Sequence, residues 1–251
     1  MPGSHVKRSR CGILRARPPI PIDIAIGMTL LPLLVLATFS VLLVTHSRSL
    51  WWIAAVMGVW AVFTGVMAYA GVLANFASFP PWIPILALTQ LAFVFWLGWF
   101  SSWSELLARI PQYILVGLQC FRVPVELLLG TLATRKLLAI EMTYYGRNFD
   151  ILEGITAIVL AIWLKRRGEE PLRLVVLAWN LMGLSLVTVV LVHGLFSVPY
   201  PSQLLHLSVS TFVIAYFPVV WLLTLLVPMA YLLHLASIKR CLTPAGASRP
   251  S

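Results

Sequence analysis

The sequence predicts an all-α integral membrane protein, a polytopic transmembrane helix bundle of about seven spans. Of its 251 residues, 60% are hydrophobic and only 10% are charged, and the mean hydropathy is +0.94. A soluble domain carries about 25% charged residues, so this chain has too few charges to cover a surface that faces water. The apolar residues also come in long blocks, each near the roughly 20 residues that a helix needs to cross a bilayer.

The predicted spans follow these apolar blocks, at a rise of about 1.5 Å per residue and a hydrocarbon core of about 30 Å. They cover residues 22–46, 50–74, 82–100, 111–133, 149–165, 172–196 and 208–236. Together they form a transmembrane domain over 22–238, between a basic, disordered tail at 1–21 and a short tail at 239–251. The block 149–165 is the shortest and follows a polar loop, so it is the weakest of the seven.

The first block is longer than the roughly 7–15 apolar residues of a signal peptide, and no small-residue cleavage pattern follows it. We therefore expect it to be a permanent span. The second block carries a stripe of small residues at steps of three and four, which lets a neighbouring helix approach closely. This stripe predicts that 50–74 is a central helix, and it consists of Ala54, Gly58, Ala61, Gly65 and Ala68. The third block opens with Pro80, Pro81 and Pro84, as helix starts often do.

The fourth block carries a polar face, because Gln119, Arg122 and Glu126 recur at three- and four-residue steps. Arg122 lies about 16 Å into the span, near the midplane. A charge there costs about 2.5–3.5 kcal/mol on insertion scales, and Glu126 can offset much of this cost as its i,i+4 partner. Pro124 lies between the two and cannot donate to the carbonyl of Cys120. We expect a kink there and a carbonyl that is free for another partner.

Two further polar side chains, Gln90 and Asn180, reach a similar depth in the third and sixth blocks. With Gln119, Arg122 and Glu126 they predict a polar pocket at mid-membrane. One hypothesis is a binding or transport protein, in which Arg122 binds an anionic group and Glu126 carries a proton. The competing hypothesis is a structural or assembly subunit, in which the same side chains only join helices. An intramembrane lipid-modifying enzyme is a third.

The loop before the fifth block, 141–150, is the most polar one. Asp150 followed by Glu153 predicts a capping box at the start of that helix. The alternative is that Asn148, Asp150 and Glu153 form the mouth of the polar pocket. In the last block, Pro218 and Pro228 are expected to free the carbonyls of Ile214 and Thr224.

The histidines lie near the predicted span ends, where interfacial side chains need no cofactor. A haem between His193 and His206, or between His46 and His234, is geometrically possible, but no cofactor and no metal site is predicted. No lysine lies at mid-membrane, which excludes a retinal Schiff base. The sequence also lacks a phosphate loop, a nucleophile elbow and a dinucleotide fingerprint, so enzyme chemistry has no visible motif.

The net charge of +10 sits in tails and loops, as expected for the flanks of membrane spans rather than for a nucleic-acid partner. The cationic residues divide almost evenly between the two sides, so they do not decide the orientation. An aromatic belt is predicted at one membrane face from Trp51, Trp52, Trp99, Trp103 and Trp163. Cys11 and Cys241 are predicted to lie in the two tails, on opposite faces, where they cannot pair.

A run of residues in the second half resembles a family of multi-pass bacterial membrane proteins that has no settled activity. The likeness rests on Arg122 to Glu126, on 142–157 with its GRNFDI loop, and on Trp179-Asn180. It implies a bacterial inner membrane location and implies nothing about chemistry. The bilayer is the predicted partner, with another membrane protein or a second copy of the chain as further possibilities.

Overall fold

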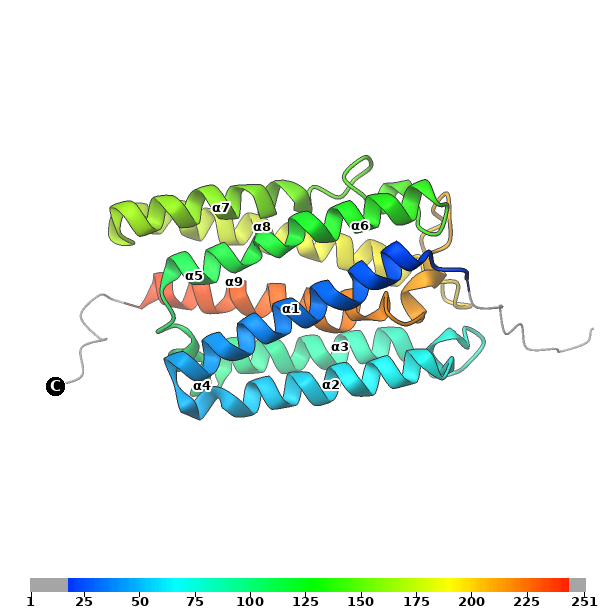
Figure 1. Cartoon of the computed structure of the whole chain (residues 1–251), viewed down its shortest axis with the longest axis horizontal. Coiled ribbons are helices and arrows are strands. Elements are labelled where there is room, and N and C mark those ends of the chain that lie inside the picture. The colour runs from blue at the N-terminus through cyan, green and yellow to red at the C-terminus, as the bar shows by residue number, and fades with distance from the viewer. Residues whose placement is uncertain (1–17, 244–251) are drawn as a thin grey trace, which may run out of the picture.

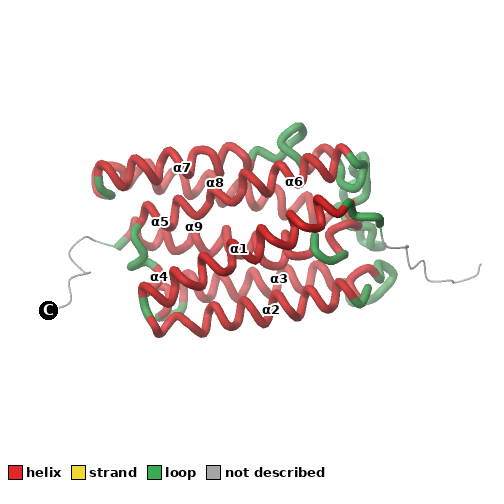
Figure 2. The backbone as a smooth tube through the Cα atoms, viewed as in Figure 1, coloured by secondary structure: helices red, strands yellow, loops and turns green. Residues whose placement is uncertain are grey.

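The structure is a computed structural model that describes residues 18–243. Its helices run lengthwise beside one another in a single bundle (Figure 1), and this part of the chain contains no strand (Figure 2). The all-α prediction is therefore confirmed. The helices are α1 (Ile22–His46), α2 (Trp51–Tyr69), α3 (Trp82–Phe95), α4 (Trp103–Leu107), α5 (Gln112–Gly117), α6 (Arg122–Thr134), α7 (Asp150–Arg167), α8 (Arg173–Phe196) and α9 (Val227–Leu242).

Several of these helices continue into tighter or wider turns. The π-helical segments Trp96–Phe100 and Leu222–Leu226 extend α3 and α9, and the 3-10 segment Leu118–Phe121 joins α5 to α6. The 3-10 segment ends three residues before Pro124 and includes Cys120, the residue whose carbonyl Pro124 cannot bond. The helix is therefore locally tightened just before Pro124, where the sequence predicts a kink.

Six helical stretches in the described residues are long and apolar enough to cross a membrane. They are Ile22–His46, Arg48–Tyr69, Trp82–Phe100, Gln112–Thr134, Glu170–Phe196 and Leu222–Leu242. The protein is thus a multi-pass membrane protein by the length and composition of its helices. The second span is shorter than the predicted 50–74, because Gly71 adopts φ +77° and ends the helix.

The fifth predicted helix, 149–165, forms as α7 but differs from the other spans. It has acidic residues in its first turn and three basic residues in its last, so it falls outside the apolar set. It also begins partway along the bundle, because the chain after α6 folds back before α7 starts (Figures 1 and 2). Non-helical backbone at membrane depth is tolerated where protein surrounds it. The segment between α6 and α7, followed by α7 itself, therefore carries the chain back along the bundle.

The last helix lies further along the chain than predicted. The prediction was 208–236, whereas the continuous helix runs from Leu222 to Leu242. Residues 211–215 form a separate 3-10 turn, and Pro218 follows it. Proline cannot continue a helix from the preceding turn, which explains the late start. As a consequence, residues 239–242 belong to α9 and not to a tail, and Cys241 is buried in the bundle.

The central helix is α9 and not the predicted second span. In the most apolar stretch of Leu222–Leu242, 89% of residues are buried, against 28% in Arg48–Tyr69. Only part of the small-residue stripe meets a neighbour: the indole nitrogen of Trp221 donates to the carbonyl of Ala61 at 2.8 Å, while a Cβ on Gly58 would meet nothing within 4 Å. Helix α2 therefore turns much of its surface to lipid.

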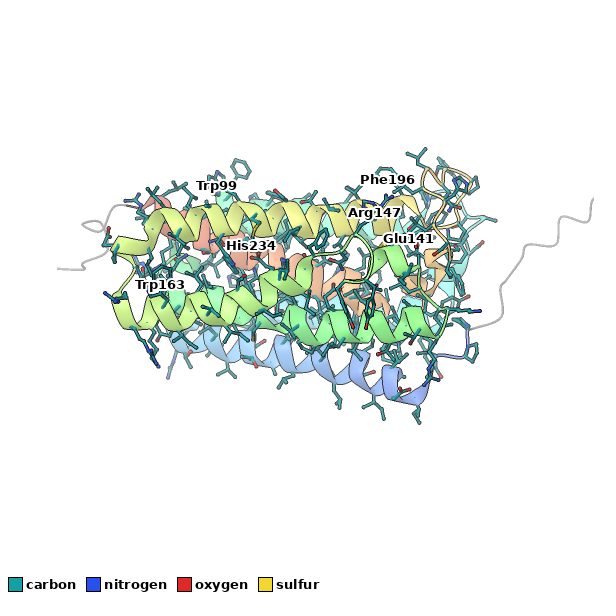
Figure 3. The ribbon with its side chains drawn as sticks, turned by 90° about the horizontal axis from the view of Figure 1, so that it is seen from above. Trp99, Glu141, Arg147, Trp163, Phe196 and His234 are labelled. Atoms are coloured by element: carbon teal, nitrogen blue, oxygen red, sulfur yellow. The ribbon has the colours of Figure 1, made fainter. Side chains whose placement is uncertain are left out.

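The two ends of the bundle agree with the predicted topology. The chain enters and leaves the described part at opposite ends (Figure 1), as an odd number of crossings requires. The rings of Trp52 and Trp103 pack 5.4 Å apart at one end, and Trp99 and Trp163 lie toward that end in Figure 3. These four tryptophans therefore lie toward one end of the bundle, where the sequence predicts an aromatic belt. Residues 1–17, including Cys11 and most of the predicted basic tail, lie outside the described residues.

Candidate functional site

Arg122 lies at the first residue of α6 and is only 2% exposed. It is ten residues beyond Gln112, so it lies about 15 Å from the start of this span. Its Nη1 donates to Oδ1 of Asp150 at 3.2 Å, and its Nη2 lies 3.1 Å from Nε2 of His234. The predicted i,i+4 partnership of Arg122 with Glu126 is therefore wrong. The partner carboxylate comes from the next helix, because α7 begins beside Arg122.

A glycine allows α7 to begin there. A Cβ on Gly154 would lie 2.7 Å from Cγ2 of Val123 and 2.9 Å from its backbone nitrogen. No larger residue fits that approach, so Gly154 brings the first turn of α7 against the first turn of α6. Asp150 lies four residues earlier, on the same helical face, and therefore points at Arg122.

Asn148 holds the start of α7 and also reaches Glu126. Its Oδ1 accepts from the backbone nitrogen of Asp150 at 3.0 Å. Its Nδ2 donates to Oε1 of Glu126 and, at 3.3 Å, to the carbonyl of Met142. The predicted capping box is therefore wrong: no side chain caps α7 from Asp150 or Glu153, and both carboxyl groups are left for other contacts.

Glu153 is the most unusual of these carboxyl groups. It is 0% exposed, and neither of its oxygens has a hydrogen-bond partner within residues 18–243. Its Oε1 lies 3.8 Å from Nε2 of His234. Gly183 of α8 makes this meeting possible, because a Cβ there would lie 2.2 Å from that oxygen and 2.4 Å from Cε1 of His234. We call Arg122, Asp150, Glu153 and His234 the ionisable cluster.

His234 connects the ionisable cluster to α8. Because the arginine can only donate to Nε2, the proton of a neutral ring resides on Nδ1. Nδ1 lies 2.8 Å from Oδ1 of Asn180, whose Nδ2 donates to the hydroxyl of Ser237 at 2.7 Å. The Nε2 of Gln112 donates to the same hydroxyl. A series of polar contacts therefore runs from Arg122 to the first turn of α5.

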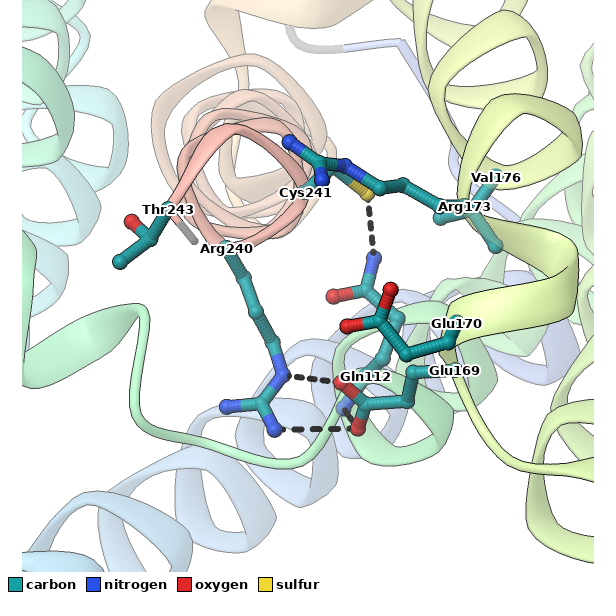
Figure 4. Close-up of a pocket in the computed structure, with 8 residues that line it drawn as sticks. All are labelled: Gln112, Glu169, Glu170, Arg173, Val176, Arg240, Cys241 and Thr243. Atoms are coloured by element: carbon teal, nitrogen blue, oxygen red, sulfur yellow. Dashed lines mark hydrogen bonds and ion pairs between the residues drawn. The ribbon is translucent and has the colours of Figure 1, made fainter. Parts of the chain in front are cut away.

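The series ends at a polar pocket on the end of the bundle where α5 begins (Figure 4). Its volume is about 30 Å³, and it is lined by Gln112, Glu169, Glu170, Arg173, Val176, Arg240, Cys241 and Thr243. Arg240 donates through Nε and Nη2 to the two oxygens of Glu169, at 2.7 and 3.0 Å. The backbone nitrogen of Gln112 also donates to Glu169. We call this the α5-end pocket.

A second small pocket, of about 10 Å³, lies on the other side of the ionisable cluster. Asn148, Glu141, Arg147 and His193 are among its lining residues, and Asn148 is the residue that holds Glu126. In Figure 3, Glu141 and Arg147 lie toward one end of the molecule and Trp163 toward the other, with His234 between them. We call this the Glu141 pocket. The ionisable cluster therefore lies between two polar pockets.

The predicted site residues divide into two groups. Arg122, Asn180, Asp150 and Glu153 take part in the contacts above, and Glu126 joins them through Asn148. Gln119 donates to the carbonyl of Ala230 at 3.1 Å and joins α5–α6 to α9. Gln90 lies elsewhere: its Nε2 donates to the carbonyl of Thr224, so the predicted pocket of the third, fourth and sixth helices does not include it.

His234 is the member that the sequence did not indicate. The prediction placed it near the end of a span at 236, whereas α9 continues to Leu242 and buries it completely. Lys239 and Arg240, which suit a helix C-terminus, were the signal for the longer helix. Both ring nitrogens of His234 have partners inside the bundle, whereas His46 is the last residue of α1. The two are therefore not arranged as a haem pair.

Within the described residues, no group of three or more His, Cys, Asp or Glu side chains is arranged to hold a metal ion. Comparison with known proteins gives no further guide, since no family model, curated protein or solved structure matches this chain.

Proposed function

We propose that this multi-pass membrane protein takes up protons at Glu153 and His234 and passes them between the two ends of the bundle. The observation that carries the proposal is the Glu153 carboxyl, which is fully buried and has no hydrogen-bond donor among residues 18–243. An ionised carboxylate without a donor is costly in a low dielectric, and a bound proton removes that charge. Buried ionisable residues of this kind mark proton relays and ion paths in membranes.

The arrangement of charges favours a proton over a larger anion. The guanidinium of Arg122 does not lose its proton, so it remains a fixed positive charge. Two of its three nitrogens are already engaged, by Asp150 and His234. An anionic substrate would have to displace both. Asp150 supplies the counter-charge for Arg122, which leaves Glu153 as the carboxyl that can change its charge.

The proton transfer step follows from the contacts. A proton on Glu153 Oε1 moves to Nε2 of His234, which requires Arg122 to release that nitrogen and the 3.8 Å separation to shorten. The ring is then an imidazolium, and Glu153 is a carboxylate beside Arg122. The Nδ1 proton then leaves to water on the side of Asn180 and Ser237, because neither the amide oxygen nor the hydroxyl there can keep it, and the ring is neutral again with its proton on Nε2. One proton enters and one leaves, and the ring must exchange its proton back to Nδ1 before the next transfer.

The polar pockets at either side supply entry and exit. The α5-end pocket reaches the ring through Gln112, Ser237 and Asn180. The Glu141 pocket reaches the cluster through Asn148, which contacts Glu126 and the backbone of Asp150. Glu126 Oε2 also lacks a partner within the described part of the chain, so it is a second proton acceptor on that side.

The test is proton flux in vesicles. Purified full-length protein is reconstituted into liposomes that contain a pH-sensitive dye, and a potassium diffusion potential is applied with valinomycin. We expect a potential-driven pH change in wild-type vesicles and none above protein-free vesicles for Glu153→Gln, which keeps the shape and removes the acid. His234→Asn should behave like Glu153→Gln, because either change breaks the transfer.

The control is Glu105→Gln, which removes an exposed carboxyl from α4 and should conduct like wild type. Each variant is checked for a single symmetric peak in size-exclusion chromatography before reconstitution. Wild-type vesicles that hold their gradient at both polarities would contradict the proposal. The cluster would then be a structural one that joins α6, α7, α8 and α9, as the competing hypothesis requires.

A further inference from the structure

An ion pair between Arg240 and Glu169 lines the α5-end pocket (Figure 4). Arg240 belongs to α9, and Glu169 belongs to the short loop between α7 and α8. The two side chains are 26% and 37% exposed, so water reaches the pair. Glu169 also accepts from the backbone nitrogen of Gln112 at 3.0 Å, and Arg240 also donates to the carbonyl of Ala108 at 2.9 Å. The pair therefore ties α9 and the α7–α8 loop to the start of α5.

The groups on the inner side of this pocket are buried. Gln112 is 2% exposed and Cys241 is 7% exposed, although both line the pocket. The Nε2 of Gln112 lies 3.6 Å from the sulfur of Cys241 and donates to the hydroxyl of Ser237. Ser237 is 1% exposed and is not among the residues that line the pocket. Its hydroxyl therefore meets the pocket only through the amide of Gln112.

The proposed proton transfer requires this pocket to widen. In that transfer, a proton from the ring of His234 leaves to water beside Ser237. A glutamine amide does not titrate, so water itself must pass Gln112. The bond from the backbone nitrogen of Gln112 to Glu169 opposes this movement, because it fixes the first residue of α5. The pair with Arg240 in turn fixes Glu169.

Water can replace each contact that opening would break. An ion pair with this exposure is weak in water. The backbone nitrogen of Gln112 is one of the free amides at the start of α5, which water satisfies as well. Arg240 keeps the carbonyl of Ala108 when Glu169 leaves. Gly168 precedes Glu169 at φ +83°, and a Cβ there would meet nothing within 4 Å, so the space beside the loop is open.

We propose that the Arg240–Glu169 pair is a latch, which closes the α5-end pocket and which opens to let water reach Ser237. The purpose of the latch rests on the proposed function, because an open latch connects the ring of His234 with water. Opening also uncovers Cys241, which lines the same pocket. The accessibility of this thiol to water therefore reports the state of the latch without any measurement of protons.

The test is the rate at which Cys241 reacts with charged thiol reagents. Full-length protein that carries Cys11→Ser and Cys120→Ser is held in nanodiscs, which leave both faces accessible, and is treated with a cationic or an anionic methanethiosulfonate. We expect Glu169→Gln to raise the rate about fivefold with both reagents, the effect of losing a well-aligned ion pair of this exposure. A rate that rises with the anionic reagent and falls with the cationic one would show a change of local charge only, and it would overturn the proposal.

The matched control is Glu170→Gln. Glu170 is next to Glu169 and lines the same pocket, but it makes no hydrogen bond or ion pair with another residue drawn in Figure 4. Its rate should stay close to that of the parent protein. Arg240→Gln, alone or together with Glu169→Gln, should match Glu169→Gln alone, because the two side chains form one contact. Effects that multiply in the double variant would show two independent structural losses and would contradict the latch.

Proton flux in liposomes separates the latch from the proton proposal. If Cys241 reacts faster in Glu169→Gln while wild-type vesicles show no flux, the latch stands and only the proton proposal fails. If wild-type vesicles conduct protons while Cys241 reacts equally fast in Glu169→Gln and in the parent protein, the latch alone fails.

Discussion

Helix α9 has a different kind of neighbour on each side (Figure 1). Toward α2 and α3, the polar contacts of α9 and of the segment before it are neutral except near its C-terminal end, where Lys239 donates to the carbonyl of Trp99 at 3.4 Å. Thr224 donates to Thr64 at 3.1 Å, and Trp221 donates to the carbonyl of Ala61. Toward α6, α7 and α8, α9 meets the ionisable cluster through His234. Neutral hydrogen bonds and apolar contacts are therefore enough to join helices on the α2–α3 side.

The difference between the sides bears on function. A charged group at mid-membrane is costly, and the α2–α3 side shows that helix packing here does not need one. The charges of the ionisable cluster, on the side of α6, α7 and α8, therefore exceed what the joining of helices requires. The excess of charge favours proton transfer over a purely structural role, and measuring how each side of α9 contributes to stability tests this difference.

The largest effect is expected from Arg122→Met. Removing one partner of a buried ion pair leaves Asp150 and Glu153 without their positive charge, which costs about 3–5 kcal/mol. The measurement is the free energy of unfolding in mixed micelles, followed by circular dichroism. The matched change on the neutral side is Thr64→Val, which removes one hydroxyl bond and should cost about 1 kcal/mol.

Adding Asp150→Asn to Arg122→Met should restore part of the loss, because the unpaired carboxylate is removed with it. Equal losses for Arg122→Met and Thr64→Val would show that the two sides of α9 do not differ as described.

Substitutions at two glycines compare the two sides of α9, with smaller expected changes in stability. Gly183→Ala would place a Cβ 2.2 Å from Glu153 and should cost about 1–3 kcal/mol by overpacking. Gly58→Ala on α2 meets nothing within 4 Å and should instead stabilise by about 0.5–1 kcal/mol through helix propensity. Thermal unfolding of both variants in one detergent checks the pair. A Gly183→Ala protein as stable as wild type would mean that Glu153 and His234 can separate at little cost.

The smallest effect is expected outside the membrane. Glu141 accepts from the hydroxyl of Ser208 at 2.6 Å, and this bond lowers the pKa of the Glu141 carboxyl. A lowered pKa in the folded state stabilises the protein above the unfolded value of about 4.3, and that contribution disappears as the pH falls below it. Ser208→Ala should therefore lower the melting temperature slightly at pH 7, and the difference should vanish in acid. A difference that grows in acid would contradict this assignment.

The sequence predicted some members of the site for sound physical reasons. Arg122 in an apolar span and Asn180 at a similar depth were visible because polar side chains are rare in such segments. The partners of Arg122 were not visible. The nearest carboxylate along the helix, Glu126, was the obvious choice, yet Asp150 and His234 hold it, because packing at Gly154 and Gly183 brings α7, α8 and α9 together there.

Composition and apolar block length were enough to determine that this is a multi-pass helical membrane protein, because burial in lipid is a property of each segment by itself. Proline positions alone did not determine where helices break: Pro218 precedes the late start of α9, whereas Pro32 lies inside the continuous helix α1. Only the tertiary structure decided that α9 is central, that α7 begins inside the bundle, and that Glu153 faces His234 without a donor in the described chain. These three features depend on close approach between segments that are distant in the sequence, and the sequence of a single span does not encode that approach.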